Sequence, residues 1–500
     1  MSMTPIARAV AFAALGSSIT VPTLAHAEFI KDSKASIELR NFYFNRDFRQ
    51  EGASQSKAEE WAQGFLLRYE SGYTEGTIGF GVDAIGLLGV KLDSSPDRSG
   101  TGLLKRDRET GRAQDDYGEA GITAKLRASK STLKIGTLTP KLPVIMPNDS
   151  RLLPQTFQGG ALNSMEIDGL TLDAGRLKKV NQRDSSDNED MTITGGGKRN
   201  IVVRSGLTSD KFDFAGGSYK WTDNLSTSYH YGKLDNFYKQ HYLGLVHTLP
   251  IADKQSLKSD IRWARSTDDG SSNVDNKALN AMFTYSLGYH AFGVGYQKMS
   301  GDTGFAYING ADPYLVNFIQ IGDFANKDEK SWQARYDYNF AGVGIPGLTF
   351  MTRYVKGDNI DLLTTSGEGK EWERDMDIAY VFQSGPLKNL GGEVAQRDHA
   401  HQLHQRLRRK SPDRQLHAAA LVTAGPADSR ATAIRPSPEP RGGTKRPPLG
   451  GLFHGGMPRS QRAGRIAPGA LSADTPPDQG SPPPHSWLIA PILWIDRSAP

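Results

Sequence analysis

Residues 330–340 read KSWQARYDYNF, and this short stretch shows the pattern that decides the fold. The odd positions from 331 to 339 are all polar, whereas the even positions from 332 to 340 are all apolar or aromatic. A strict period of two places these two sets of side chains on opposite faces of a β-strand. A soluble sandwich also contains such strands, so the number of similar segments along the chain carries more weight than this one.

Five other segments alternate in the same way, at residues 36–46, 60–72, 121–129, 256–264 and 374–383. Each carries aromatic or aliphatic side chains on one face and charged side chains on the other. Full charges that recur on one face need water, which a packed sandwich core does not provide. Short turns alternate with long polar loops, and strands of about ten residues with such connections are typical of a transmembrane barrel. We therefore expect an all-β fold, a transmembrane antiparallel β-barrel.

The N-terminus predicts export. Residues 1–27 combine a basic start at Arg8, a short apolar stretch at residues 9–21 and a small-x-small cleavage site at residues 25–27, as in a secretory signal peptide. A buried N-terminal helix is the structural alternative. No later segment approaches the roughly 20 consecutive apolar residues of a transmembrane helix. The chain has no cysteine, which excludes disulfides, cysteine-based zinc sites and thiol nucleophiles.

One stretch fits neither a strand nor an ordinary surface loop. Residues 139–160, TPKLPVIMPNDSRLLPQTFQGG, contain four prolines, several apolar residues and the cluster Asp149-Ser150-Arg151. Proline removes backbone donors and stiffens the chain, and the apolar residues indicate packing against another part of the protein. We expect this loop to fold into the lumen and narrow it, with Asp149, Ser150 and Arg151 near its tip. The alternative is an outer loop that closes over the barrel rim.

The sequence resembles the OprD-type outer membrane porins, which are substrate-specific channels of Gram-negative bacteria. The resemblance is carried by residues 38–47 (ELRNFYFNRD), 69–93, 150–157 (SRLLPQTF), 328–361 and 380–390 (YVFQSGPLKNL). It implies a monomeric barrel of about eighteen strands in the outer membrane, with a narrow constriction. It also implies a ladder of arginines and lysines in the lumen that guides carboxylate-bearing solutes.

Candidates for this basic ladder follow from alternation and from the resemblance. Both favour Arg40, Arg46, Arg335 and Arg353, whereas alternation alone favours the weaker candidates Arg262, Arg127 and Lys125. Several cationic sites of moderate affinity, placed one after another along the pore, attract a carboxylate without trapping it. The arginine guanidinium binds a carboxylate with two hydrogen bonds. The alternative for any single residue is a salt bridge within the lumen, to Glu38, Asp337 or Asp375.

The chain changes character near residue 391. Residues 392–500 hold 16 of the 27 prolines and 6 of the 11 histidines but no tyrosine. They also carry 15 lysines and arginines against 8 acidic residues, so the basic balance of the chain arises in this tail. A proline-, arginine- and glycine-rich segment without periodicity is expected to be disordered. An arm that binds nucleic acid or a membrane surface is the functional alternative.

A frameshift offers a sharper explanation of this tail. Permitted codons for residues 392–399, read one nucleotide out of phase, encode VKWRNATM, and the shifted reading can continue through two alternating strands to a terminal tryptophan and a stop. We hypothesise that residues 1–391 are authentic and that residues 392–500 are out-of-frame read-through. The barrel would then lack its last two strands, leaving open edges that hydrocarbon does not tolerate. Such a chain should assemble poorly.

The leading functional expectation is passive, selective diffusion of small carboxylate-bearing solutes, such as aromatic acids or amino acids, across the outer membrane. We expect outer membrane lipid around the barrel, no nucleic-acid partner, and neither a metal nor an organic cofactor. The alternatives are an outer membrane hydrolase, an adhesin with a plugged lumen, and a non-functional truncated porin remnant. No GxSxG or HExxH motif occurs in the chain, so we do not expect an enzyme.

Overall fold

The computed structural model describes residues 26–48, 53–107, 109–195, 198–364, 366–402 and 413–424, all within one compact unit, Met1–Pro438. The predicted signal peptide lies outside the described residues, except for its last two residues, which begin helix α2 (His26–Lys31). Among the described residues, no helix has the length and apolar character needed to cross a membrane. The short 3-10 helix η2 (Phe340–Val343) lies between two strands.

The described residues form one antiparallel sheet of nineteen strands. The first nine are β1 (Lys34–Phe48), β2 (Lys57–Glu70), β3 (Ile78–Asp93), β4 (Asp116–Ala128), β5 (Ser131–Leu138), β6 (Thr156–Ser164), β7 (Leu170–Asn181), β8 (Asn188–Glu189) and β9 (Phe212–Thr222). The others are β10 (Leu225–Leu234), β11 (Tyr238–Ala252), β12 (Gln255–Asp268), β13 (Asp275–Leu287), β14 (His290–Ser300), β15 (Lys330–Asn339), β16 (Leu348–Asp361), β17 (Glu368–Val381), β18 (Leu390–Gln402) and β19 (Asp413–Ala424).

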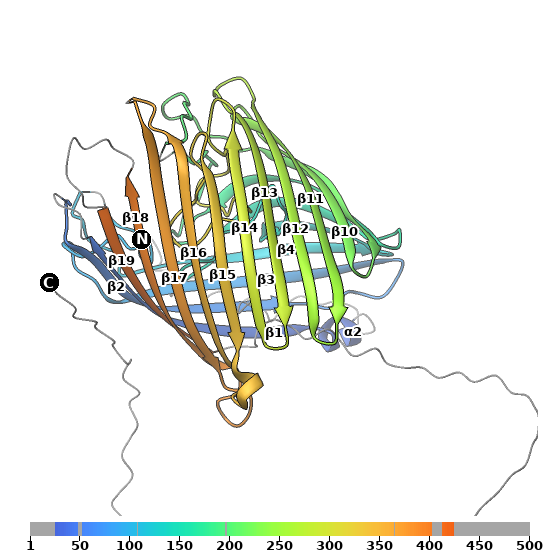
Figure 1. The fold of residues 1–500 in the computed structure, drawn as a ribbon. Helices are drawn as coiled ribbons and strands as arrows, with labels where there is room; N and C mark the ends of the chain where they lie inside the picture. The colour runs from blue at the N-terminus through green and yellow to red at the C-terminus, as the bar shows by residue number, and fades with distance from the viewer. Residues whose placement is uncertain are drawn as a thin grey trace, which may run out of the picture. The chain divides into compact units, whose positions relative to one another are not determined.

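Consecutive strands pair all the way round, and β19 pairs with β1 to close the sheet into a barrel. The two-residue β8 pairs only with the end of β7, and the rest of β7 pairs directly with β9. In Figure 1 the orange ribbons of β18 and β19 run beside the blue N-terminal strands. Closure gives every described strand except the two-residue β8 two neighbours, which a sheet in hydrocarbon requires because no water is present to satisfy an open edge.

The structure corrects the expectation that the last two strands are missing. Residues 390–402 and 413–424 form β18 and β19, and β19 aligns with β1 so that Thr423 lies opposite Arg40. Strand pairing uses backbone N–H and C=O groups, which every non-proline residue supplies, so a segment without period-two alternation can still complete a ladder. The remainder of the tail that was expected to be disordered, residues 403–412 and 425–500, lies outside the described residues.

The prediction of two contrasting faces is confirmed. Leu67 and Ile378 are each 52% exposed on the outside of the barrel, and Trp332 is 42% exposed there. On β15 the intervening residues Ser331 and Gln333 are buried on the inner side. The barrel therefore presents apolar side chains outward and polar or charged side chains to the lumen, as the alternation required.

Residues 139–155, which we call the constriction loop, cross the lumen. At one end, Val144 packs 3.0 Å from the position that a Cβ would occupy at Gly232 on β10. At the other end, Leu152 lies 3.1 Å from the corresponding position at Gly64 on β2. Two glycines of the wall thus leave room for the loop, and the inward-folding prediction agrees with this placement. The loop is shorter than expected, because residues from Thr156 onward belong to β6.

Two further long loops, residues 182–211 and residues 301–329, pack with the constriction loop. Isolated β-bridges join Met146 to Asp312 and Ile193 to Ile308. Apolar side chains from each of the three loops meet in one buried cluster, which also includes inward-facing residues of β9, β10 and β11. The interior of the barrel is therefore narrowed by three interlocked loops, whereas the sequence predicted one.

Candidate functional site: the lumen constriction

Four of the predicted ladder arginines on the barrel wall form ion pairs with fixed carboxylates. The pairs are Arg40 with Glu38 at 2.6 Å, Arg262 with Asp260 at 2.7 Å, Arg335 with Asp337 at 2.7 Å and Arg353 with Asp375 at 2.6 Å. Three of these carboxylates are the ones that the salt-bridge alternative named. Each of these wall cations is partly neutralised by its acidic partner.

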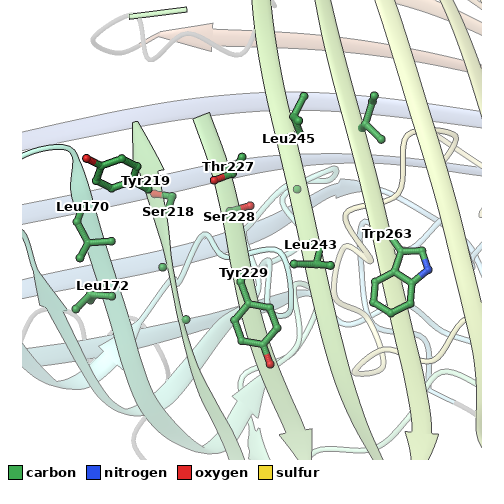
Figure 2. A pocket seen from close by; sticks show the side chains of 14 residues that line it. Leu170, Leu172, Ser218, Tyr219, Thr227, Ser228, Tyr229, Leu243, Leu245 and Trp263 are labelled. Atoms are coloured by element: carbon green, nitrogen blue, oxygen red, sulfur yellow. The ribbon is translucent and has the colours of Figure 1, made fainter. Parts of the chain in front are cut away.

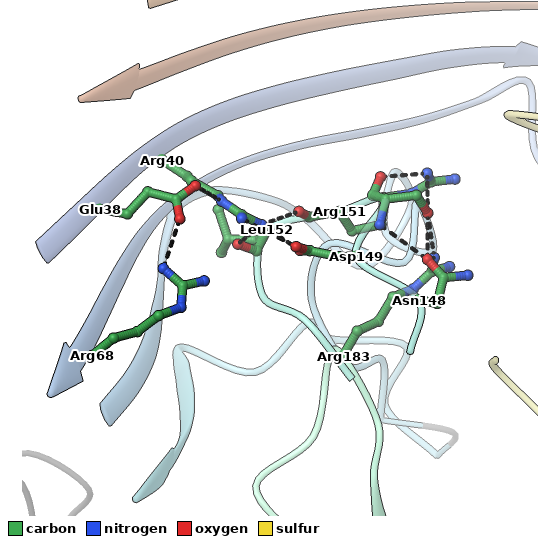
Figure 3. Close-up of polar contacts among 9 residues, drawn as sticks. Glu38, Arg40, Arg68, Asn148, Asp149, Arg151, Leu152 and Arg183 are labelled. Carbon is green, nitrogen blue, oxygen red and sulfur yellow. Dashed lines mark hydrogen bonds and ion pairs between the residues drawn. The ribbon is translucent and has the colours of Figure 1, made fainter. Parts of the chain in front are cut away.

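Arg40 also anchors the constriction loop. Its Nη1 donates to Asp149 Oδ1 at 2.5 Å and to the backbone carbonyl oxygens of Arg151 and Leu152 at 3.3 and 3.4 Å. Figure 3 shows these hydrogen bonds from Arg40 on β1 to the loop, and it shows Glu38 between Arg40 and Arg68, with which it forms ion pairs. The sequence singled out both Arg40 and Asp149, but their contact spans 109 residues and was not foreseen.

The two candidates on β4 lie away from the constriction. Lys125 pairs with Asp83 at 2.5 Å and donates to the carbonyl oxygen of Ser71 at 2.7 Å. The Arg127 guanidinium stacks on the ring of Tyr73, with its carbon 4.2 Å from the centroid. In the register of β3 and β4, Lys125 lies opposite Gly81, eight residues from the Gly89 that aligns with Gly64. At about 3.3 Å per residue, that separation is roughly 26 Å along the strand.

Arg46 lies on the inner face of β1, and its guanidinium carbon lies 4.9 Å above the ring of Phe48. Arg262 occupies the far wall on β12, where it donates to the carbonyl oxygen of Tyr314 at 2.9 Å. The guanidinium of Arg262 also lies 4.0 Å from the centroid of the Tyr314 ring. The loop of residues 301–329 therefore covers Arg262, which the alternation of β12 alone did not indicate.

The tip of the constriction loop has a partner that the sequence analysis missed. Arg183, on the loop of residues 182–211, donates from Nη1 to Asn148 Oδ1 at 3.1 Å and to Ser150 Oγ at 2.8 Å. Arg151 donates from Nη1 to the Ser150 carbonyl oxygen at 2.8 Å (Figure 3). Its guanidinium carbon lies 4.9 Å from the centroid of the Phe44 ring. A long polar loop has no periodicity, so no sequence signal distinguished Arg183 from its neighbours.

A second missed residue is Arg397 on β18. Its side chain is buried in the lumen and lies 3.3 Å from Asp375, and it also pairs with Asp377. It falls in the part of the chain that the frameshift hypothesis assigns to out-of-frame text. Among the residues with described side chains, no group of three or more histidine, cysteine or acidic residues is placed to hold a metal ion.

A groove of about 760 Å³ lies on the outer face of the barrel, over β7, β9, β10, β11 and β12. Figure 2 shows its lining side chains, including Leu172, Tyr229, Leu243 and Trp263. The outward exposure of Leu172, Tyr229 and Leu243 places the groove toward lipid, so it is not part of a path through the lumen.

The closed barrel, its inward charges and its crossing loop match a known family. The family model described as outer membrane porin, OprD family, matches residues 27–414. The chain belongs to the OprD family of outer membrane porins. It is therefore a substrate-specific outer membrane channel and not an enzyme, which excludes the hydrolase alternative.

This OprD-family porin is similar to several known proteins. Porin D of Pseudomonas aeruginosa is 40% identical over 395 residues, covering 74% of this chain and 86% of that protein. The crystal structure of Pseudomonas aeruginosa OpdQ is 86% identical and has a TM-score of 0.73, covering 80% of this chain and 99% of that one. The crystal structure of Pseudomonas aeruginosa OpdK with vanillate is 37% identical and has a TM-score of 0.71, with 80% and 99% coverage.

Proposed function

We propose that this porin carries small carboxylate-bearing solutes, such as aromatic acids or amino acids, by passive diffusion along a basic path in its lumen. The register of the wall strands is the observation that carries the proposal. Arg335 lies directly opposite Arg353, Arg353 lies opposite Asp375, and Asp375 lies opposite Arg397. One row across four neighbouring strands thus holds three arginines. The same row continues from Arg397 to position 417 on β19 and from there to Arg46 on β1.

A row of register partners runs perpendicular to the strands. Barrel strands tilt by roughly 35–45° from the barrel axis, so such a row rises obliquely through the lumen instead of forming a flat ring. With strands about 4.8 Å apart, each step from strand to strand climbs about 3 Å. A carboxylate can therefore pass from one guanidinium to the next while it advances along the pore.

The fixed carboxylates moderate this path. An arginine paired with Asp337 or Asp375 attracts a solute carboxylate less strongly than a bare cation would, because the incoming group must compete for the same donors. Conduction requires sites that bind well enough to fill and weakly enough to empty. The likeness to OpdK, whose crystal structure was determined with vanillate, supports a carboxylate as the solute group.

Export through the N-terminal signal peptide to the outer membrane of a Gram-negative bacterium is part of the same proposal.

Planar-bilayer recordings test the proposed carboxylate path. The ratio of benzoate to sodium permeability should exceed one in the wild type and should fall in Arg353→Gln. Arg112→Gln is the matched control, because Arg112 lies on an exposed loop and pairs with Asp115. Equal permeabilities in the wild type would overturn the proposal.

The outer face of β18 favours a second possibility, a porin gene that has lost its reading frame. Gln396 and Asp398 take outward positions on β18, opposite Met376 and Arg374 of β17. Gln396 therefore lies beside an apolar residue on the outer face, and Asp398 forms an ion pair with Arg374 on that face. We propose, as the sequence suggested, that residues 392–500 are read out of frame. The shifted reading supports this at outward positions 392 and 394, where it puts valine and tryptophan, and at inward positions 393 and 395, where it puts lysine and arginine. At outward position 398 it replaces the acid with threonine, whereas at 396 it keeps a polar residue, asparagine.

A further inference from the structure

The lumen arginines fall into two groups according to their counter-charges. Those on the barrel wall, such as Arg40, Arg335 and Arg353, are paired with fixed carboxylates. Arg151 and Arg183, on two different loops, form no ion pair with a carboxylate anywhere in the described part of the chain. Within that part of the chain, fixed acids act on these two guanidinium groups only without a direct ion pair, through Asp184 on Arg183 and Glu373 on Arg151.

The two guanidinium groups are neighbours. Nη1 of Arg183 and Nη1 of Arg151 both lie within hydrogen-bonding distance of the same atom, Ser150 Oγ, at 2.8 and 3.3 Å. Ser150 is itself held by Asn148, whose Oδ1 accepts from the Ser150 hydroxyl at 2.7 Å and from its backbone N–H at 3.0 Å. A short, proline-flanked segment therefore fixes the positions of both cations.

Most of the hydrogen-bonding capacity of the pair is unused. A guanidinium offers five N–H donors. Among the described residues, only Nη1 of Arg151 and only Nη1 of Arg183 donate a hydrogen bond. Both side chains are half-buried, and Nε of Arg151 is buried without a hydrogen-bond partner in the part of the chain that the structure describes.

The electrostatic setting favours an anion. Burial, followed by the like charges of Arg183, Arg46 and Arg397, lowers the pKa of Arg151 to about 9. Burial also lowers the pKa of Arg183. Arginine nevertheless stays charged in proteins, so two partly desolvated cations stand side by side at a cost that a bound anion would offset.

From these contacts we infer that Arg151 and Arg183 form an anion-binding site at the constriction, and that it selects solutes carrying two carboxylates over solutes carrying one. This inference rests on the proposed function, because it names the solute class of the same path. Two adjacent cations attract a dianion about twice as strongly as a monoanion at equal distance. The wall arginines lack this preference, since each already shares its charge with an acid. Arg183 is therefore a specificity-determining residue, although it lies on no strand.

Succinate and butyrate test the inference, because they have the same carbon chain and differ by one carboxylate. The full chain is refolded in detergent and reconstituted in planar bilayers, and permeability is measured for each anion from reversal potentials. We expect succinate to be preferred in the wild type and Arg183→Gln to reduce the succinate-to-butyrate ratio about tenfold, the loss expected for one charge-assisted contact. Arg183→Lys should retain only part of the preference, because lysine keeps the charge but not the fork.

Arg112→Gln removes one charge outside the lumen and should leave the ratio unchanged. The midpoint of thermal unfolding gives a second readout in detergent, since succinate should raise it more than butyrate does in the wild type but not in Arg183→Gln. A ratio that Arg183→Gln does not alter would overturn the dianion site while leaving a carboxylate channel intact. If neither anion permeates or stabilises the wild type, the proposed function fails as well.

Discussion

Arg335 on β15 and Arg353 on β16 lie directly opposite each other in the sheet, yet both are charged. Like charges at opposed positions destabilise a strand pair. The structure resolves the conflict with two acids: Asp337 accepts two hydrogen bonds from Arg335 at 2.7 and 2.8 Å, and Asp375 accepts one from Arg353 at 2.6 Å. Asp337 and Asp375 therefore have two effects: they reduce the attraction of the path for a solute carboxylate, and they stabilise the two opposed arginines in the sheet.

Asp375 is the acid on which this arrangement depends most. It is fully buried and lies between Arg353 and Arg397. Removing one partner of a buried ion pair costs about 3–5 kcal/mol, so Asp375→Asn should lower the free energy of unfolding by about that amount. Urea titration in detergent measures the change. Asp115→Asn, at an exposed pair, should cost less than about 1 kcal/mol, and equal effects of the two variants would contradict the assignment.

The anchoring of the constriction loop predicts a conductance change. Asp149→Ala removes the carboxylate that accepts from Arg40, which should loosen the loop and raise single-channel conductance by about 1.5-fold or more, because the open area limits current through a narrow pore. Arg176→Ala breaks an exposed pair with Asp213 and serves as the control. A conductance that stays at the wild-type value in Asp149→Ala would show that Asp149 does not hold the loop.

Glu329, at the end of the loop of residues 301–329, predicts a dependence on pH. Burial raises the pKa of Glu329 to about 7. Its Oε2 accepts from Asn326, and the charged groups that face it are Glu371 and Arg199. A carboxyl group with a raised folded-state pKa stabilises the fold fully below its unfolded pKa of about 4.3, and the fold loses stability as the pH rises from there to about 7.

The loss between these pH values should be on the order of 3 kcal/mol and should level off about one pH unit above the folded-state pKa. Thermal unfolding of the wild type and of Glu329→Gln at pH 4.5 and pH 7.5 measures it. The glutamine variant cannot ionise, so its unfolding midpoint should change less between the two conditions. An identical pH response in both proteins would rule out Glu329 as the source.

The frameshift proposal predicts a difference in membrane assembly. Deleting one base at codon 392 should yield a chain with valine at outward position 392, tryptophan at outward position 394 and no acid at outward position 398, and this chain should insert more efficiently than the chain as written. A lysine or arginine that faces lipid costs up to about 2–4 kcal/mol near the middle of the bilayer, and an acidic side chain such as Asp398 costs less. Heat-modifiable migration in electrophoresis after refolding into liposomes reports insertion. Equal insertion of both chains, or genomic DNA that cannot encode the shifted reading, would refute the proposal.

The sequence by itself determined the faces of the strands. Alternation in residues 330–340 put Arg335 on the polar side and Trp332 on the apolar side, and the barrel places them in the lumen and toward lipid. This prediction succeeds because side-chain direction in a strand is a local property with a period of two. The stiff, apolar composition of residues 139–155 likewise indicated a loop that packs inward.

Tertiary structure alone decided which charges meet. The contact of Arg40 with Asp149 joins residues 109 positions apart, and the meeting of Arg151 and Arg183 at Ser150 joins two loops with no periodic pattern. The closure of β19 on β1 also could not be foreseen, because backbone pairing does not require an alternating sequence. Local patterns specify the direction of a side chain, whereas its neighbour depends on strand register and loop packing, which are properties of the closed barrel as a whole.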